Sequence, residues 1–338
     1  MDYELIADGL CNVEGPTIGP CGWILNVCSV SRPTESWPTR GGDITATRVN
    51  RPLETHALFS TSTESVDGIP AALAFGPDGA LYVCDEGRRS ILRVGFDGTI
   101  RDFIADHDGR PLNGPNDLSF DDAGNLFFTD PWTSSPRNPI AGVYGYDWIS
   151  GELSRIDSGM QFTNGIVASG ARLLVAETYP RTVWLYDIEG PGRAGNKRQF
   201  CILPDVDDPP LLPRAIRDAA GVDYVVGPDG MCLDEEDNLY VAHYGGGGVY
   251  VYDSDGDHVG TIATIGRFPT NVCFGGDDHR VLFISIDDPG TIIACSPGPR
   301  GMQLPFCPSR SPAHPFGAMF RLGGPAQSMS GHRPLFKT

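Results

Sequence analysis

One short apolar phrase recurs along the chain, and the spacing of its copies constrains the fold more than any other feature. Five copies are clear, and a looser sixth precedes them: Ala71–Phe75, Asn116–Phe120, Asn164–Ala168, Asp229–Leu233, Thr270–Phe274 and Glu14–Ile18. All but one of the steps between successive clear copies fall within roughly 40 to 50 residues, which is the period of β-propeller repeats. The step from Asn164 to Asp229 is longer.

Each copy begins a set of short apolar runs separated by turns rich in Asp and Gly, such as Gly76–Gly79 and Asp121–Gly124. Runs of this length between such turns predict β-strands joined as hairpins. Four antiparallel strands per repeat form the blade of a β-propeller. We therefore predict an all-β, six-bladed propeller that occupies residues 1–297 as one domain. The long step predicts an insertion at about 190–226, and the Pro-rich residues 298–338 predict a poorly ordered C-terminal tail.

Charge and composition exclude several classes of partner. The chain has 25 Lys and Arg against 43 Asp and Glu, a formal net charge of −18, and such a surface repels the phosphates of nucleic acids. No apolar run is long enough to span a membrane, and Met1–Leu5 does not resemble the start of a secretory signal. We expect a monomer or homodimer that acts on a small molecule, without nucleic-acid or membrane partners.

The cysteines indicate a reduced protein. The nine Cys are scattered, and none forms a Cys-x-x-Cys pair. Cys232 and Cys273 fall within apolar runs, where a thiol behaves as a small hydrophobic group. This usage predicts a cytoplasmic location, with a disulfide between Cys21 and Cys28 as the alternative.

The residues that begin the repeated phrase predict a metal site. In a ring of repeats these lead positions meet around one axis, and four of the six carry hard oxygen donors: Glu14, Asn116, Asn164 and Asp229. Two carboxylates and two amide carbonyls, without thiol or imidazole, suit Ca²⁺ at the relaxed mouth of a propeller channel. We predict Ca²⁺ in the central channel, with Mg²⁺, Mn²⁺ or Zn²⁺ as alternatives. Asn and Asp are also common turn residues, which is the competing interpretation of any one position.

Longer segments resemble a known family. Leu112–Pro131 is similar to the signature segment of the gluconolactonase/regucalcin superfamily of calcium-dependent six-bladed β-propeller hydrolases, also called senescence marker protein-like. Gly227–Gly230 and Pro269–Asp278 resemble the later signatures of this family. The resemblance covers roughly residues 10–296. It implies the fold and the metal, and it places the metal ligands on the same four lead residues.

Two departures from the family pattern lie where a substrate would bind. Gluconolactonases often carry a Cys-Glu-His-Gly segment, whereas this chain has Cys84–Gly87 with Glu86 in place of the His. The segment after Asp130 is usually aromatic and rich in glycine, but here it contains Trp132 followed by Thr, Ser, Ser and Pro. These changes argue against an ordinary sugar lactone as the substrate.

Metal-assisted hydrolysis of a cyclic ester needs a base to activate water. Asp229, Asp117 and Asp130 are the candidates, although Asp117 can instead brace the blade through backbone hydrogen bonds. Candidate substrate-binding residues are Asn116, Glu86, Trp132, His243 and Asn271. His243 lies in a glycine-rich stretch that we interpret as a loop.

Three functions remain open at this point. The first is a calcium-dependent lactonase of the gluconolactonase type. The second is a phosphotriesterase similar to diisopropylfluorophosphatase, which would use the same oxygen ligands against a phosphoryl group. The third is a biosynthetic or calcium-binding protein that keeps the fold without hydrolysis.

Overall fold

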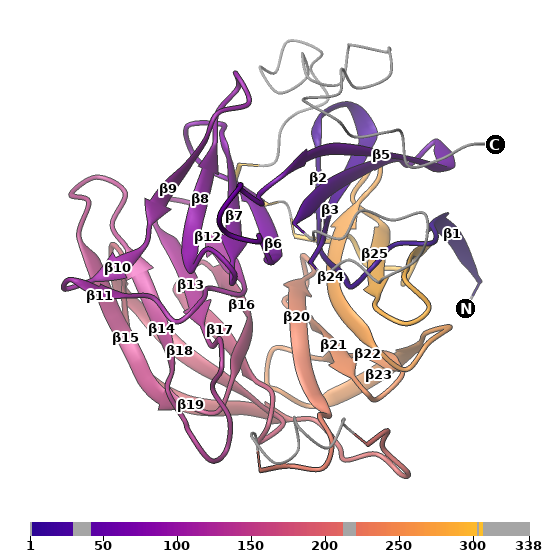
Figure 1. Cartoon of the computed structure of the whole chain (residues 1–338). Helices are drawn as coiled ribbons and strands as arrows, with labels where there is room; N and C mark the ends of the chain where they lie inside the picture. Colours follow the sequence, from indigo (N-terminus) through magenta and orange to yellow (C-terminus); the bar gives the residue numbers. More distant parts are fainter. Residues whose placement is uncertain (1, 30–41, 212–220, 303, 307–338) are drawn as a thin grey trace.

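The computed structural model describes residues 2–29, 42–211, 221–302 and 304–306. It contains six four-stranded antiparallel sheets arranged around a central channel, which confirms the six-bladed propeller (Figure 1). Blades 1 to 3 consist of β2 (Val13–Ile18), β3 (Trp23–Cys28), β4 (Asp43–Arg48), β5 (Arg51–Ser60); β6 (Pro70–Phe75), β7 (Leu81–Asp85), β8 (Ser90–Val94), β9 (Ile100–Ile104); and β12 (Leu118–Phe120), β13 (Leu126–Asp130), β14 (Ala141–Tyr146), β15 (Leu153–Met160).

The second half repeats this order, and its last blade is completed by the N-terminus. Blades 4 to 6 consist of β16 (Thr163–Ser169), β17 (Arg172–Glu177), β18 (Thr182–Gly190), β19 (Arg193–Ile202); β20 (Gly227–Leu233), β21 (Leu239–Tyr244), β22 (Gly248–Tyr252), β23 (His258–Ala263); and β24 (Pro269–Gly275), β25 (Val281–Ile286), β26 (Thr291–Cys295), β1 (Tyr3–Ala7). A small extra hairpin, β10 (Asp106–His107) with β11 (Arg110–Pro111), lies between blades 2 and 3 in the chain.

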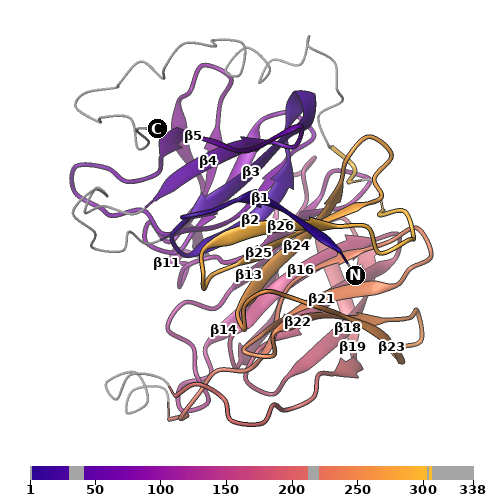
Figure 2. The same ribbon diagram turned by 90° about the vertical axis from the view of Figure 1, so that its right-hand side faces the viewer.

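Strand β1 closes the ring by pairing with β26. The two are antiparallel, with Leu5 opposite Ile293 and Ala7 opposite Ile292 (Figure 2). The repeated phrase contains no signal for this closure, because β1 precedes the first copy. Pairing the two ends of the domain in one sheet ties the first and last parts of the ring together and covers what would otherwise be an exposed edge of β26.

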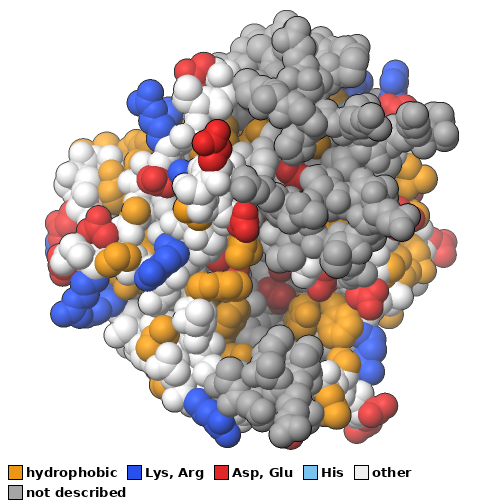
Figure 3. Space-filling view, viewed as in Figure 1, with side chains coloured by type: hydrophobic (Ala, Val, Ile, Leu, Met, Phe, Trp, Pro, Cys, Tyr) orange, Lys and Arg blue, Asp and Glu red, His pale blue; other side chains and the backbone are white. Residues whose placement is uncertain are grey.

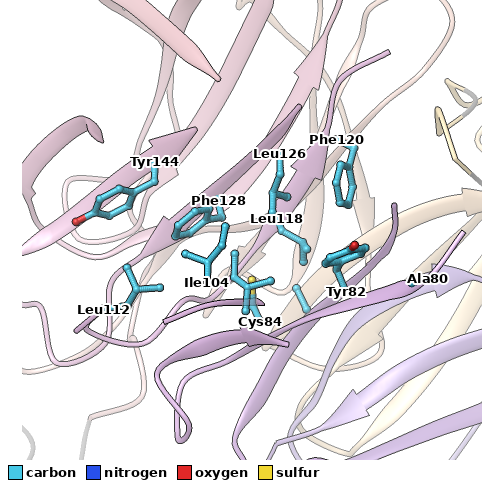
Figure 4. Close-up of a cluster of buried hydrophobic side chains, with 12 residues drawn as sticks. Ala80, Tyr82, Cys84, Ile104, Leu112, Leu118, Phe120, Leu126, Phe128 and Tyr144 are labelled. Carbon is cyan, nitrogen blue, oxygen red and sulfur yellow. The ribbon is translucent and has the colours of Figure 1, made fainter. Parts of the chain in front are cut away.

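The hydrophobic core lies between adjacent blades. The middle strands β7 and β13 are buried at every position, because each sheet is covered on both faces by its neighbours. Between blades 2 and 3, for example, Tyr82 packs edge-to-face on Phe120, with ring centroids 5.4 Å apart (Figure 4). Burial on both faces explains why these strands appear as continuous apolar runs in the sequence instead of alternating apolar and polar residues.

The Asp- and Gly-rich turns are held by their own carboxylates. Asp121 Oδ1 accepts hydrogen bonds from the backbone N–H groups of Ala123 and Asn125. Asp234 makes the equivalent bonds two blades later, to Glu236 and Asn238. This is the behaviour expected of Asp in tight turns, and it confirms the predicted turns between the first and second strands.

Two boundaries differ from the sequence-based expectation. The predicted insertion at 190–226 begins too early, because residues 193–202 form β19, the fourth strand of blade 4. Part of the predicted tail packs against the propeller: Gly301 forms a bridge with Asp234, and Phe306 contacts Phe120. Met302, Leu304 and Phe306 line one end of a channel cavity of about 90 Å³. The rest of the tail, 307–338, lies outside the described residues.

Across the described part of the chain, no helix is long and apolar enough to cross a membrane.

The closure by β1 generates a stability prediction. Replacing Ile6, which is fully buried against blade 6, with Ala should lower the free energy of unfolding by about 2 to 5 kcal/mol, because it leaves a cavity. Tyr3 is 51% exposed in the same strand, and Tyr3→Ala should change stability by less than about 1 kcal/mol. Urea denaturation measures both. Equal effects of the two substitutions would contradict the role assigned to β1.

Candidate functional site

The lead residues of the repeated phrase lie at one end of the central channel. Each inner strand (β2, β6, β12, β16, β20 or β24) contacts the inner strands of both neighbouring blades, so the six form a closed ring. Glu14 and Asn164 are the second residues of β2 and β16, Asp229 is the third residue of β20, and Asn116 lies two residues before β12. Figure 3 shows acidic side chains near the middle of this face, with hydrophobic side chains beside them.

A glycine follows the lead residue in three of these four blades, and each is needed for close contact between inner strands. A Cβ atom on Gly15 would lie 2.6 Å from the Cα of Ala72 in the next blade. A Cβ on Gly165 would overlap the backbone oxygen of Asp229, and one on Gly230 would overlap the side chain of Asn271. These glycines let the lead residues converge on the axis.

The carboxylates of the ring lie close together and are buried. Burial raises the pKa of Glu14 well above its ordinary value, and the neighbouring Asp229 carboxylate raises it further. Burial and the charge of Asp117 raise the pKa of Asp229, against a hydrogen bond from Asn164 that lowers it. None of the described Lys or Arg side chains forms an ion pair with Glu14, Asp117 or Asp229. A bound cation would relieve this repulsion.

The two amides of the ring are held by their nitrogen atoms. Asn116 Nδ2 donates to Glu86 Oε1 at 3.0 Å, and Asn164 Nδ2 donates to Thr178 Oγ1 at 3.3 Å. The Thr178 hydroxyl in turn donates to the carbonyl of Pro228, next to Asp229. The Asn164 nitrogen also bonds to Asp229, and neither amide carbonyl oxygen accepts a hydrogen bond from the described residues, so both can serve a cation. Burial raises the pKa of Glu86 to about 8, although its bond from Asn116 acts in the opposite direction.

These four side chains fit a hard divalent cation by their chemistry. They combine two carboxylates with two oriented amide carbonyls, the donor types that Ca²⁺ prefers. Within the described ranges there is no cluster of three or more His, Cys, Asp and Glu side chains arranged for a metal, as expected for a set with only two carboxylates.

Asp117 and Asp130, two of the predicted bases, hold backbone groups. Asp117 accepts from the N–H of Leu118 with one oxygen and from that of Ile166 in the next blade with the other. Asp130 accepts from Asn113 and Gly114. Burial raises the pKa of Asp117 to about 7. Asp117 therefore joins the inner strands of two blades, and Asp130 holds the segment that leads into β12.

His243 differs from the sequence-based expectation. It lies within β21, not in a loop, and is fully buried. Neither ring nitrogen has a hydrogen-bond partner, and the ring packs edge-to-face on Tyr250, with centroids 4.8 Å apart. Burial lowers the pKa of His243 to about 4, and the nearby Arg181 adds to the effect. The ring is therefore neutral at physiological pH.

The other two predicted substrate residues lie close to the ring. Asn271 is buried against Gly230 and accepts a hydrogen bond from the Val272 N–H. Trp132 is half-buried, and its side chain lies beside Gly114, whose other neighbour is Glu86.

Two residues near the ring were missed from the sequence. Burial raises the pKa of Tyr244, with further contributions from Asp287, Asp229 and Glu14, so its hydroxyl lies near these carboxylates. Asp287 likewise raises the pKa of Glu14. Tyr244 is the last residue of the second strand of blade 5, and Asp287 directly follows the second strand of blade 6, as Glu86 and Thr178 do in their blades. Aligning the ends of the second strands, in the same way as the lead positions, would have found them.

Comparison with known proteins gives a consistent family. Residues 42–287 match the model of the SMP-30/Gluconolactonase/LRE-like region. The chain is 32% identical to diisopropyl-fluorophosphatase from Loligo vulgaris over 56% of this chain and 59% of that protein. It is 29% identical to gluconolactonase from Zymomonas mobilis over 62% of this chain and 58% of that protein. The chain therefore spans about three fifths of the length of these two relatives.

The fold also matches solved structures. One is a calcium-binding protein, regucalcin, from Agrobacterium tumefaciens, with a TM-score of 0.65 and 16% identity. The match covers 89% of this chain and 94% of that one. At this identity the likeness supports the propeller architecture alone.

The contact between inner strands predicts the effect of a single methyl group. Gly165→Ala should lower the free energy of unfolding by about 1 to 3 kcal/mol, because the new Cβ meets backbone that must shift. A Cβ on Gly190 would meet nothing within 4 Å, so Gly190→Ala serves as the control. Chemical denaturation of both variants measures the difference. An unchanged Gly165→Ala variant would contradict the close contact.

The buried acids predict a pH dependence for the metal-free protein. The folded-state pKa values of Asp117 and Glu86 are raised to about 7 and about 8. The stability that their protonation contributes is therefore complete below the ordinary carboxyl pKa values, and it is lost as the pH rises to the raised folded-state values. In EDTA, the melting temperature should fall between pH 5 and 8.5. Asp117→Asn should make this fall smaller, and an equally steep fall in that variant would count against the assignment.

Proposed function

The chain belongs to the SMP-30/gluconolactonase/LRE-like family, and we propose that it is a divalent-cation-dependent hydrolase that opens the ring of a lactone. The observation that carries the proposal is the ring of four oxygen donors, in which Glu14 and Asp229 are buried together without a basic partner among the described residues. Family membership and the lactonase names of relatives support the reaction class.

We propose Ca²⁺ as the ion, held by Glu14, Asn116, Asn164 and Asp229. The oxygen-only donor set favours it over Mn²⁺ and Zn²⁺, and the relaxed mouth of the channel favours it over Mg²⁺. When bound, the ion supplies a Lewis acid that polarises the carbonyl of the ester. The two carboxylates balance its charge, and the two amides, whose nitrogens bond to Glu86 and Thr178, add neutral oxygens.

Asp229 is the base that we propose for the activation of water. Asp117 and Asp130 each accept backbone N–H groups with both oxygens. Either residue would have to lose one of these hydrogen bonds to take a proton from water. Trp132, Tyr244 and Asn271 lie around the ring, and we assign them to substrate contact.

A phosphotriester is the second candidate substrate. The diisopropyl-fluorophosphatase relative shares more identity with this chain than the gluconolactonase relative does. The same oxygen donors suit either reaction, because in both the charge develops on an oxygen next to the ion.

The proposed function predicts loss of activity on removal of the metal or of Asp229. EDTA should abolish lactone hydrolysis and added Ca²⁺ should restore it, while Asp229→Asn should lower kcat/KM on the order of 100-fold or more. Asp187 is an exposed acid in blade 4 that pairs with Arg198, so Asp187→Asn is the control and should retain activity. Assays with a sugar lactone, an aryl lactone and an aryl phosphotriester compare the substrate classes. Hydrolysis that survives both EDTA and Asp229→Asn would refute the proposal.

A further inference from the structure

A second set of side chains lies immediately behind the lead residues. In each blade one position directly follows the residue equivalent to Asp85, near the end of the second strand. In blades 1, 2, 4, 5 and 6 this position carries a polar side chain: Ser29, Glu86, Thr178, Tyr244 and Asp287. We call these residues the outer ring. It has the same period as the lead residues, so each of its members lies next to the start of an inner strand.

The outer ring makes repeated contacts with the inner strands. Ser29 Oγ donates to the carbonyl of Pro70 at 2.6 Å, and Thr178 Oγ1 donates to the carbonyl of Pro228 at 2.9 Å. These are equivalent bonds in different blades, each between an outer-ring hydroxyl and the residue just before a lead position. Blade 2 departs from this pattern, because Glu86 bonds to the lead side chain of the next blade, Asn116, whereas Thr178 accepts from Asn164 in its own blade.

We propose that Glu86 is a positioning residue that sets the direction of the Asn116 amide toward the cation, an inference that rests on the proposed metal site. In this structure Asn116 Nδ2 donates to Glu86 Oε1, so the NH₂ end of the amide faces Glu86, which acts as the acceptor. The carbonyl oxygen at the opposite end of the planar amide then points away from Glu86. None of the described residues donates to this oxygen, which leaves it for an ion.

The burial of Glu86 makes this orientation firm. The side chain is 6% exposed, and Gly114, whose added Cβ would lie 2.9 Å from the Glu86 carbonyl, packs closely against its backbone. The backbone N–H of Asn116 bonds to the Thr129 carbonyl, and Glu86 is the hydrogen-bond partner of its side chain among the described residues. Without Glu86 the amide could turn and present its NH₂ to the cation, which would repel it. Partners behind metal ligands commonly change affinity about 10- to 100-fold.

The test measures Ca²⁺ binding to the metal-free protein by calorimetry, independently of activity. Glu86→Leu, which removes the acceptor, should weaken Ca²⁺ binding about 10- to 100-fold. Glu86→Gln keeps an acceptor oxygen for Asn116 and should stay within about threefold of the unaltered protein. Glu177 is equally buried and bonds to Gln161 and Trp184, so Glu177→Leu controls for general destabilisation and should leave Ca²⁺ affinity nearly unchanged.

A double substitution tests whether Glu86 acts through Asn116. If it does, adding Glu86→Leu to Asn116→Ala should cost no further affinity. The proposal is overturned if Glu86→Leu binds Ca²⁺ normally, if Glu86→Gln is weakened as much as Glu86→Leu, or if the two losses add. Failure of the unaltered protein to bind any divalent cation would overturn this proposal together with the metal assignment. The expected binding pattern without lactone hydrolysis would overturn the proposed activity alone.

Discussion

The contact between neighbouring inner strands is the constraint on which both the fold and the site depend. At Gly15, Gly165 and Gly230 the adjacent blade occupies the space that a side chain would fill. This contact brings six strand starts to one axis, and it brings the lead side chains with them. The site is therefore a consequence of how the blades meet, and it needs no dedicated loop to assemble it.

The electrostatics of the ring oppose folding and favour binding. Burying Glu14 beside Asp229 raises the pKa of each, so the metal-free protein holds its acids in an unfavourable setting. Backbone braces such as the bonds of Asp117 to Leu118 and Ile166 keep the strands in place despite this repulsion. A cation that binds the folded state stabilises it by mass action and removes the repulsion at the same time.

Periodicity predicted the blades and the lead residues, because both repeat in phase. It could not predict what occurs once. Strand β1 is the fourth strand of blade 6 but precedes the first copy of the phrase in the sequence, and its pairing with β26 joins the two ends of the domain. Strand β19 was included in the predicted insertion because the long β18–β19 hairpin adds its extra length within a single blade. His243 was placed in a loop because the glycines after it suggested one, yet it lies in β21 and pairs with Pro228 of β20. The role of Glu86 needed the Asn116 bond, which no spacing reveals.

The two blades that give no oxygen ligand have a different part in the ring. Thr270 of blade 6 donates its hydroxyl to the carbonyl of Val13, next to Glu14, and so ties the last blade to the first. Ala71 of blade 2 offers only its backbone, which packs against Gly15. Both blades flank blade 1, and each brings an outer-ring carboxylate, Asp287 or Glu86, toward the axis instead. In the proposed site, protein oxygens from four blades would leave part of a calcium shell to water or substrate, since this ion takes six to eight ligands. An open shell of this kind, next to buried acids, would let one fold act on either a carbonyl or a phosphoryl oxygen.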